Sequence, residues 1–251
     1  MSDIPSRDQF RPQLPALEIP EIENLPRSRL KSMAAAGEEV LDCLRVLETV
    51  DLNIVGEVLR GNGTFYEHEH YPPEDVFDRH SQSQYYYHAH RDASGENGHF
   101  HAFLRAPGMP AGTRPVAYSG AEPWPTGPEA LSHLIAISMD TYGRPIGLFA
   151  VNRWVTAEAW YAGEDVIRML DRFVIDHASP SWPVNRWISA MVRLFRPQIE
   201  ALVRHRDAVV HAWANTHPGI DVFEDRDLDV TGHIAIHVAQ QIDAVRTALA
   251  R

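Results

Sequence analysis

The stretch YYYHAHRDASGENGHFHAFLR, residues 85–105, contains two His-x-His triplets joined by a polar segment with two glycines. Successive side chains of a β-strand point to opposite faces of the sheet, so each triplet puts both of its imidazoles on one face. The joining segment, residues 92–98, has the composition of a hairpin loop. The stretch therefore predicts two antiparallel strands connected by that loop.

The register of this hairpin follows from its apolar side chains, which alternate with the histidines. They are Tyr85, Tyr87 and Ala89 on the first strand and Phe100, Ala102 and Leu104 on the second. A slip of one residue would mix the apolar set with the histidines, so apolar residues should pair with apolar residues. This register gathers His88, His90, His99 and His101 on the opposite face. We predict a transition-metal site there, and the alternative is a half-exposed strand face that binds no metal.

Two neighbouring features extend this prediction. The segment TFYEHEHYP, residues 64–72, alternates like a strand and carries a third triplet, His68 and His70. It is expected either to add metal ligands or to form a solvated edge strand. Tyr86 falls on the histidine face, where a phenol could orient a substrate or a bound water as a catalytic group, or simply pack on a cross-strand neighbour. His133, which begins a later predicted strand, could reach the same layer.

The ligand set limits the choice of metal. Imidazoles favour zinc, copper, iron or nickel over magnesium and calcium. The sequence has a single cysteine, Cys43, in an apolar helical pattern, so neither a disulfide nor a thiolate cluster is available. The predicted cofactor is therefore a transition metal ion (Zn, Cu or Fe) held by histidine.

The remaining periodicity predicts an α+β fold. A central antiparallel sheet of about four to six strands is expected at about residues 64–155, covered by helices from both ends of the chain. The expected strands after the hairpin are residues 133–140 and 145–155. The expected helices are residues 28–50, 51–59, 163–174, 187–195, 197–216 and 233–250. Residues 1–26 are proline-rich and predict an extended arm, and residues 27–251 predict a single domain.

Two further features carry expectations about function. His233 and His237 are four apart on the last expected helix, but the glutamate of a HExxH motif is absent, so we interpret them as a structural pair. The proline-rich segment at residues 107–128 should be an ordered loop beside the histidine face, with Trp124 helping to wall a substrate-sized cavity.

The amino-acid composition indicates which classes of binding partner are disfavoured. The 251 residues include 23 Lys and Arg against 34 Asp and Glu, a net charge of −11, which disfavours nucleic acids and anionic membrane surfaces. The N-terminus lacks the apolar core of a signal peptide, and no apolar run is long enough to span a bilayer, so we expect a soluble cytoplasmic protein. The arm at residues 1–26 is expected to be a free tail, to pack on its own domain, or to contact another subunit in a homo-oligomer.

The leading hypothesis is thus a histidine-ligated metalloenzyme, redox or hydrolytic, that acts on a small molecule. One alternative is a metal or haem module used for storage or sensing, without catalysis. Another is a structural or regulatory protein whose histidines are incidental. A closed site would favour the binding module, whereas an open position facing a pocket would favour the enzyme.

Overall fold

The computed structural model describes residues 15–89 and 95–251. Within them, one six-stranded antiparallel sheet has its strands in chain order from β1 to β6. The strands are β1 (Tyr71–Phe77), β2 (Ser83–His88), β3 (Glu96–Arg105), β4 (Leu131–Asp140), β5 (Pro145–Val151) and β6 (Val230–Ala235). The helices are α1 (Arg27–Glu48), α2 (Ile54–Leu59), α3 (Arg153–Thr156), α4 (Gly163–Met169), α5 (Trp182–Leu194), α6 (Arg196–Thr216) and α7 (Val238–Ala250), with short 3-10 helices η2 (Ile22–Asn24) and η3 (Ala106–Gly108). The predicted α+β class is confirmed.

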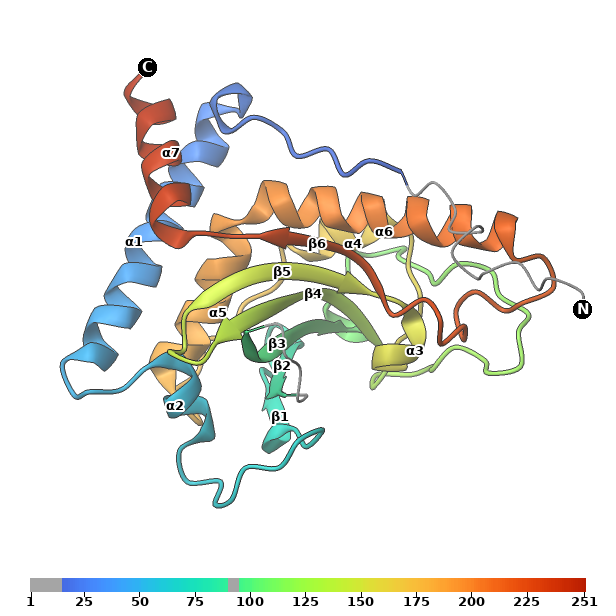
Figure 1. Cartoon of the computed structure of the whole chain (residues 1–251), viewed down its shortest axis with the longest axis horizontal. Helices are drawn as coiled ribbons and strands as arrows, with labels where there is room; N and C mark the ends of the chain where they lie inside the picture. The colour runs from blue at the N-terminus through green and yellow to red at the C-terminus, as the bar shows by residue number, and fades with distance from the viewer. Residues whose placement is uncertain (1–14, 90–94) are drawn as a thin grey trace, which may run out of the picture.

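One face of the sheet is covered by helices. Phe100 on β3 packs against Trp187 on α5, with ring centroids 5.3 Å apart, and both side chains are fully buried. The Tyr85 hydroxyl on β2 donates a hydrogen bond to Asn185 Oδ1 at 2.6 Å, which fixes the position of α5 across the sheet. α1 packs on the outer side of α5, and α7 lies beside α1 (Figure 1). Burial of aromatic and aliphatic side chains, about 1.5–3 kcal/mol each, is the main stabilisation of this layer.

The predicted pairing of the apolar set of one hairpin strand with that of the other is confirmed. Tyr85 pairs with Ala102 and Tyr87 pairs with Phe100, so the apolar set of β2 meets the apolar set of β3 under the helices. The same register places His88 directly opposite His99. The histidines therefore occupy the face of the sheet that points away from α5.

The limits of the sheet differ from the prediction at both ends. β1 begins only at Tyr71, and residues 64–70 form no strand. β6 comes from a segment that was expected to begin the last helix, which instead starts at Val238 with His237 as its N-cap. Gly232 lets α6 pack closely on β6, since a Cβ at this position would lie 2.7 Å from the ring of His205 on α6.

The described part of the N-terminal arm packs on its own chain. η2 lies against α7, and Ile22 and Leu25 contact the small apolar cluster of Leu30, Met33 and Val245. A contact with a second subunit stays a prediction.

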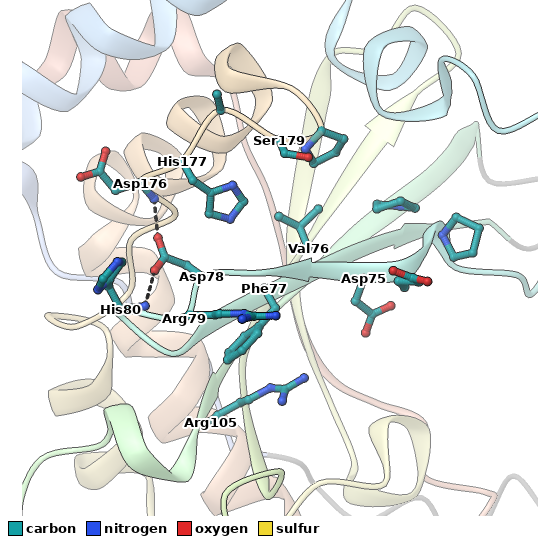
Figure 2. A pocket seen from close by; sticks show the side chains of 15 residues that line it. Asp75, Val76, Phe77, Asp78, Arg79, His80, Arg105, Asp176, His177 and Ser179 are labelled. Carbon is teal, nitrogen blue, oxygen red and sulfur yellow. Dashed lines mark hydrogen bonds between the residues drawn. The ribbon is translucent and has the colours of Figure 1, made fainter.

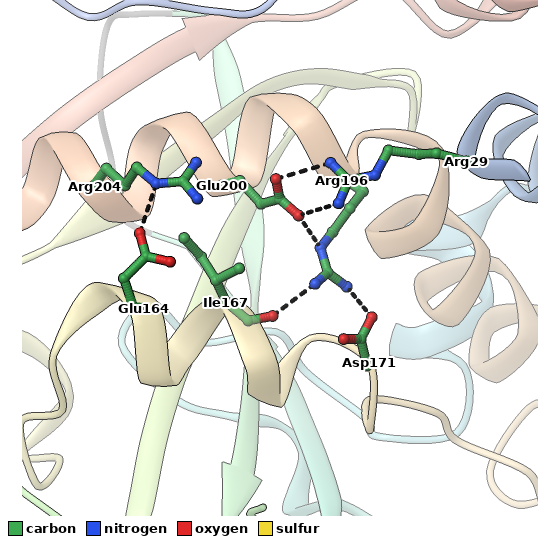
Figure 3. A network of polar contacts seen from close by, with 7 residues as sticks. All are labelled: Arg29, Glu164, Ile167, Asp171, Arg196, Glu200 and Arg204. Atoms are coloured by element: carbon green, nitrogen blue, oxygen red, sulfur yellow. Dashed lines mark hydrogen bonds and ion pairs between the residues drawn. The ribbon is translucent and has the colours of Figure 1, made fainter. Parts of the chain in front are cut away.

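Ion pairs tie the helices together at the outer surface of this layer (Figure 3). Arg29 on α1 holds Glu200 on α6 through two hydrogen bonds of 2.9 and 3.0 Å, and Arg196 adds a third at 2.7 Å. Arg196 also bonds Asp171 just beyond α4 at 2.7 Å. Because the Glu200 side chain is only 8% exposed, this network fixes the relative positions of α1, α4 and α6.

None of the helices in the described part of the chain combines the length and apolar character that a membrane span requires.

Candidate metal centre

Three histidines converge on the face of the sheet opposite α5. His88 is the last residue of β2, and His99 and His101 lie two residues apart on β3. Their side chains are buried, with exposed fractions of 9%, 6% and 0%. Each offers a ring nitrogen, and these three nitrogens lie within 4.8 Å of one another, the one such group found among residues 15–89 and 95–251. His88 Nε2 and His99 Nε2 are 2.7 Å apart.

Glu96 orients one of these rings. Its carboxylate, at the start of β3, accepts a hydrogen bond from His99 Nδ1. Because a carboxylate can only accept, Nδ1 carries the proton and Nε2 keeps its lone pair, which is directed toward His88. Carboxylate–histidine pairs of this kind hold the tautomer of many metal-binding histidines.

His133 plays the corresponding part for His101. Nε2 of His133, on β4, lies 3.0 Å from Nδ1 of His101. His101 Nε2 is buried and has no hydrogen-bond partner within the described parts of the chain. Burial, together with the neighbouring His99 and His133, lowers the pKa of His101 well below its usual range. A neutral ring with its Nδ1 bonded to His133 can present a lone pair on Nε2, as a metal ligand requires.

A buried acid lies behind His133. The Glu158 carboxylate accepts a hydrogen bond from the backbone N–H of His133, and its residue is 1% exposed. Burial raises the pKa of Glu158 to about 7, opposed by the charge of Arg206. Burial likewise lowers the pKa of His133 to about 3. Burial thus shifts the pKa of each of these two groups in the direction that favours its uncharged form.

A cavity of about 440 Å³ opens beside His99 and His101. Its lining residues come from β3, β4, β5, α3 and the entry to β6: Glu96, His99, His101, Ser138, Phe149, Val151, Val155, Asp229, Val230 and His233. The volume lies within the range of small-molecule sites, roughly 300–1,000 Å³. Three protein ligands beside an open cavity are the arrangement of catalytic rather than structural zinc sites.

The third histidine triplet does not join this group. His68 has a φ of 63° in the loop before β1, where its backbone N–H donates to the carbonyl of Ala89 at 3.1 Å. The ring of His70 stacks on Tyr86 at a centroid distance of 3.6 Å, and its Nδ1 donates to Asp75 at 2.9 Å. A ligand role for His68 or His70 stays a prediction. His90, the remaining predicted ligand, lies outside the described residues.

Tyr86 sits among the rings of the site. It is 6% exposed, its ring centroid is 5.2 Å from that of His101, and Phe103 packs on it at 5.5 Å. Burial raises the pKa of its phenol. These contacts fit the packing alternative for Tyr86, and its catalytic role stays a prediction.

The prediction for Trp124 is wrong. Its ring stacks on Tyr118 at 3.9 Å, and its Nε1 donates to the carbonyl of Val116 at 2.8 Å. It belongs to a cluster with Phe223 and Trp160 rather than to the cavity lining given above. The wall was expected from residues 107–128 because that segment follows β3 directly, but β5, α3 and β6 supply it instead.

Sequence reasoning missed several residues of the site. It noted that His133 could reach the histidine layer, which its bond to His101 confirms. It did not find Ser138, Asp229 or Glu158. His233 was assigned to a helix beside His237, and this was wrong because His233 lies on β6 and faces the cavity. The alternation of VTGHIA, residues 230–235, is the one signal that could have placed it.

A larger cavity, about 1140 Å³, lies between β1 and residues 176–180 (Figure 2). Its lining includes none of the three candidate ligands His88, His99 and His101. Its central acid, Asp78, accepts hydrogen bonds from the backbone N–H groups of His80, Ser81 and Asp176 at 2.7–3.0 Å. The guanidinium of Arg105 lies 3.9 Å from the ring centroid of Phe77. Asp78 and Arg105 thus already have partners, and the lining holds no convergent group of three metal-binding side chains among the described residues.

Comparison with known proteins places the chain in a family without adding a function. No curated protein and no solved structure matches it. Residues 34–236 match a family described as a domain of unknown function (DUF6969), over a span that holds all six strands and the three histidines. Because this match covers more than half of the sequence, the protein belongs to the DUF6969 family.

Proposed function

We propose that this protein is a metal-dependent enzyme. His88, His99 and His101 hold a transition metal ion, and the adjoining cavity presents a small molecule to it. The observation that carries the proposal is the convergence of three buried histidines, each with a ring nitrogen within 4.8 Å of those of the other two. One of them, His101, has a buried Nε2 without a hydrogen-bond partner among the described residues.

A metal ion satisfies this arrangement better than hydrogen bonds alone. Leaving a buried polar atom unsatisfied costs about 1–3 kcal/mol, and a His88–His99 hydrogen bond does nothing for His101. Two nitrogens bound to one tetrahedral ion at 2.0–2.1 Å lie roughly 3.3 Å apart. The His88 and His99 nitrogens, now 2.7 Å apart, therefore need to separate by only about 0.6 Å to share an ion.

The cavity favours an enzyme over a storage or sensing module. It reaches His99 and His101 directly, so an ion held by three protein nitrogens keeps a position accessible to a small molecule. Such an ion can activate a bound water or polarise a substrate, and copper or iron would add redox chemistry. The identity of the metal decides between these reactions.

The test is the metal content of protein purified without a histidine tag. We expect about one zinc, copper or iron ion per chain in the wild type, and its loss in the double variant His99→Gln/His101→Gln. The control is His211→Gln, which removes an exposed imidazole on α6. Circular dichroism checks that each variant folds. Unchanged metal content in the folded double variant would refute the site.

A further inference from the structure

The cavity beside the metal centre is built by small residues aligned across the sheet. His99 pairs with Ser138, and Ser138 pairs with Gly147 on β5, so these positions form one row on the histidine face. Small side chains at the second and third positions leave a hollow next to His99. A Cβ on Gly147 would lie 2.6 Å from Nε2 of His233, so the His233 ring lies directly over the glycine. The His233 ring therefore fills the space over Gly147 and bounds the hollow on the side of β6.

Two residues at the inner end of the cavity each have a buried polar atom without a hydrogen-bond partner among the described residues. Ser138 is 2% exposed, and its Oγ has no hydrogen-bond partner in residues 15–89 and 95–251. His101 Nε2 is in the same situation. Because buried polar groups in native proteins are nearly always satisfied, two such atoms lining one cavity point to a polar ligand.

The polarity of the cavity changes along its length. Beyond the inner end, Phe149, Val151 and Val155 form an apolar wall. The mouth is formed by Asp229, His233 and Val230, all exposed, with Val230 at 48%. Neither lysine nor arginine occurs among the described lining residues, and the two lining acids are Asp229 and Glu96. Glu96 is already bonded to His99, so Asp229 is the carboxylate that faces an incoming molecule.

We infer that the substrate of this centre is a small amine. Its metal-binding end lies at His99, His101 and Ser138, its apolar body lies along Phe149 and Val151, and its ammonium group lies at Asp229 at the mouth. This inference rests on the proposed function, because the metal defines the inner end. Anionic molecules are disfavoured, since the mouth offers a carboxylate and no lining cation.

The inference is tested with three imidazoles that share a metal-binding ring and differ in the charge of their tails. They are 1-(3-aminopropyl)imidazole, 1-butylimidazole and 3-(imidazol-1-yl)propionate. Each is titrated into protein loaded with cobalt(II), and binding is followed by the visible absorption of the ion. An ion pair at an exposed rim changes affinity by up to about fivefold. We expect the amine to bind about fivefold more tightly than the neutral butyl compound, with the carboxylate weakest.

Matched variants localise the effect. Asp229→Asn should make the affinities of the amine and the butyl compound equal, whereas Asp227→Asn, the same charge change at an exposed residue outside the lining, should preserve the difference. Ser138→Ala should leave the order of the three compounds unchanged, because an N-alkylated ring has no polar atom left for the Ser138 hydroxyl once its free nitrogen binds the metal. Cobalt uptake should be unaffected in all three variants.

The outcomes separate this inference from the proposed function. If the wild type takes up no stoichiometric cobalt, both are refuted. If cobalt binds but the carboxylate binds as tightly as the amine, or if Asp229→Asn preserves the preference for the amine over the butyl compound, only the amine inference is refuted. Equal binding of the amine by metal-free and cobalt-loaded protein would also refute it, because the ring would then not be at the metal.

Discussion

Removing the Glu96 carboxylate should weaken metal binding without removing a ligand. In the structure this carboxylate accepts a hydrogen bond from Nδ1–H of His99, whose side chain is 8% exposed. In Glu96→Ala the Nδ1–H loses this acceptor, and the ring is free to rotate or to place its proton on Nε2, where it blocks the metal. Loss of such a supporting partner typically costs 10–100-fold in metal affinity.

The magnitude can be bounded from the same contact. A factor of 10–100 corresponds to about 1.4–2.7 kcal/mol, close to the roughly 1–3 kcal/mol for a buried donor left without a partner. The Glu96 side chain is 25% exposed, so water reaches the space that it leaves, and the lower half of this range is expected. Glu96→Gln keeps an acceptor oxygen but no charge, and should fall between the wild type and Glu96→Ala.

The assay is a competition titration of zinc against a chromophoric chelator at pH 7. Glu122→Gln, which changes an exposed acid of the loop before β4, is the control for net charge. A zinc Kd for Glu96→Ala within twofold of that of the wild type would refute the argument. A shift of the same size in Glu122→Gln would also contradict it, since the effect would then belong to overall charge.

Two further predictions concern stability. The folded pKa of Glu158, about 7, lies above its unfolded value near 4.5, so its stabilising contribution is complete below pH 4.5 and is lost as pH rises through about 7. As pH rises over that interval, the free energy of unfolding of Glu158→Gln should increase relative to that of the metal-free wild type by about 1.4 kcal/mol per pH unit. Urea unfolding at several pH values measures this difference, and a difference that does not change with pH would contradict the prediction. Metal bound only to the folded chain raises its stability, so a chelator at neutral pH should lower the melting temperature of the wild type but not that of His99→Gln/His101→Gln. An equal response of the two proteins would argue against a bound ion.

The sequence was most informative where structure is local. Alternation alone predicted that Tyr85 and Ala102 share one face of the hairpin and His88 and His99 the other, because a one-residue slip would have buried the wrong face. It did not fix which residues pair. The helix at residues 28–50 was found within two residues of α1, since its apolar repeat spans many turns.

What the sequence did not reveal depends on distant segments. β6 pairs with β5 although most of the helices separate them in the chain, and six residues are too few to tell a strand period from a helical one. The cavity arises from the alignment of Ser138 with Gly147, and the register of β4 and β5 shifts at the next residue, Met139. Such register shifts are set by packing between strands, so the sequence of either strand alone does not predict them.

The hairpin of β2 and β3 has a consequence for how this protein can diversify. All three candidate ligands, with the carboxylate that orients His99, come from one contiguous segment, whereas the mouth of the cavity comes from residues 229–233, far along the chain. Under the proposed function, metal binding and substrate choice therefore depend on separate parts of the sequence. Mutations near β6 would then change which molecules enter the cavity without altering the three candidate ligands, so relatives that share the hairpin need not share a substrate.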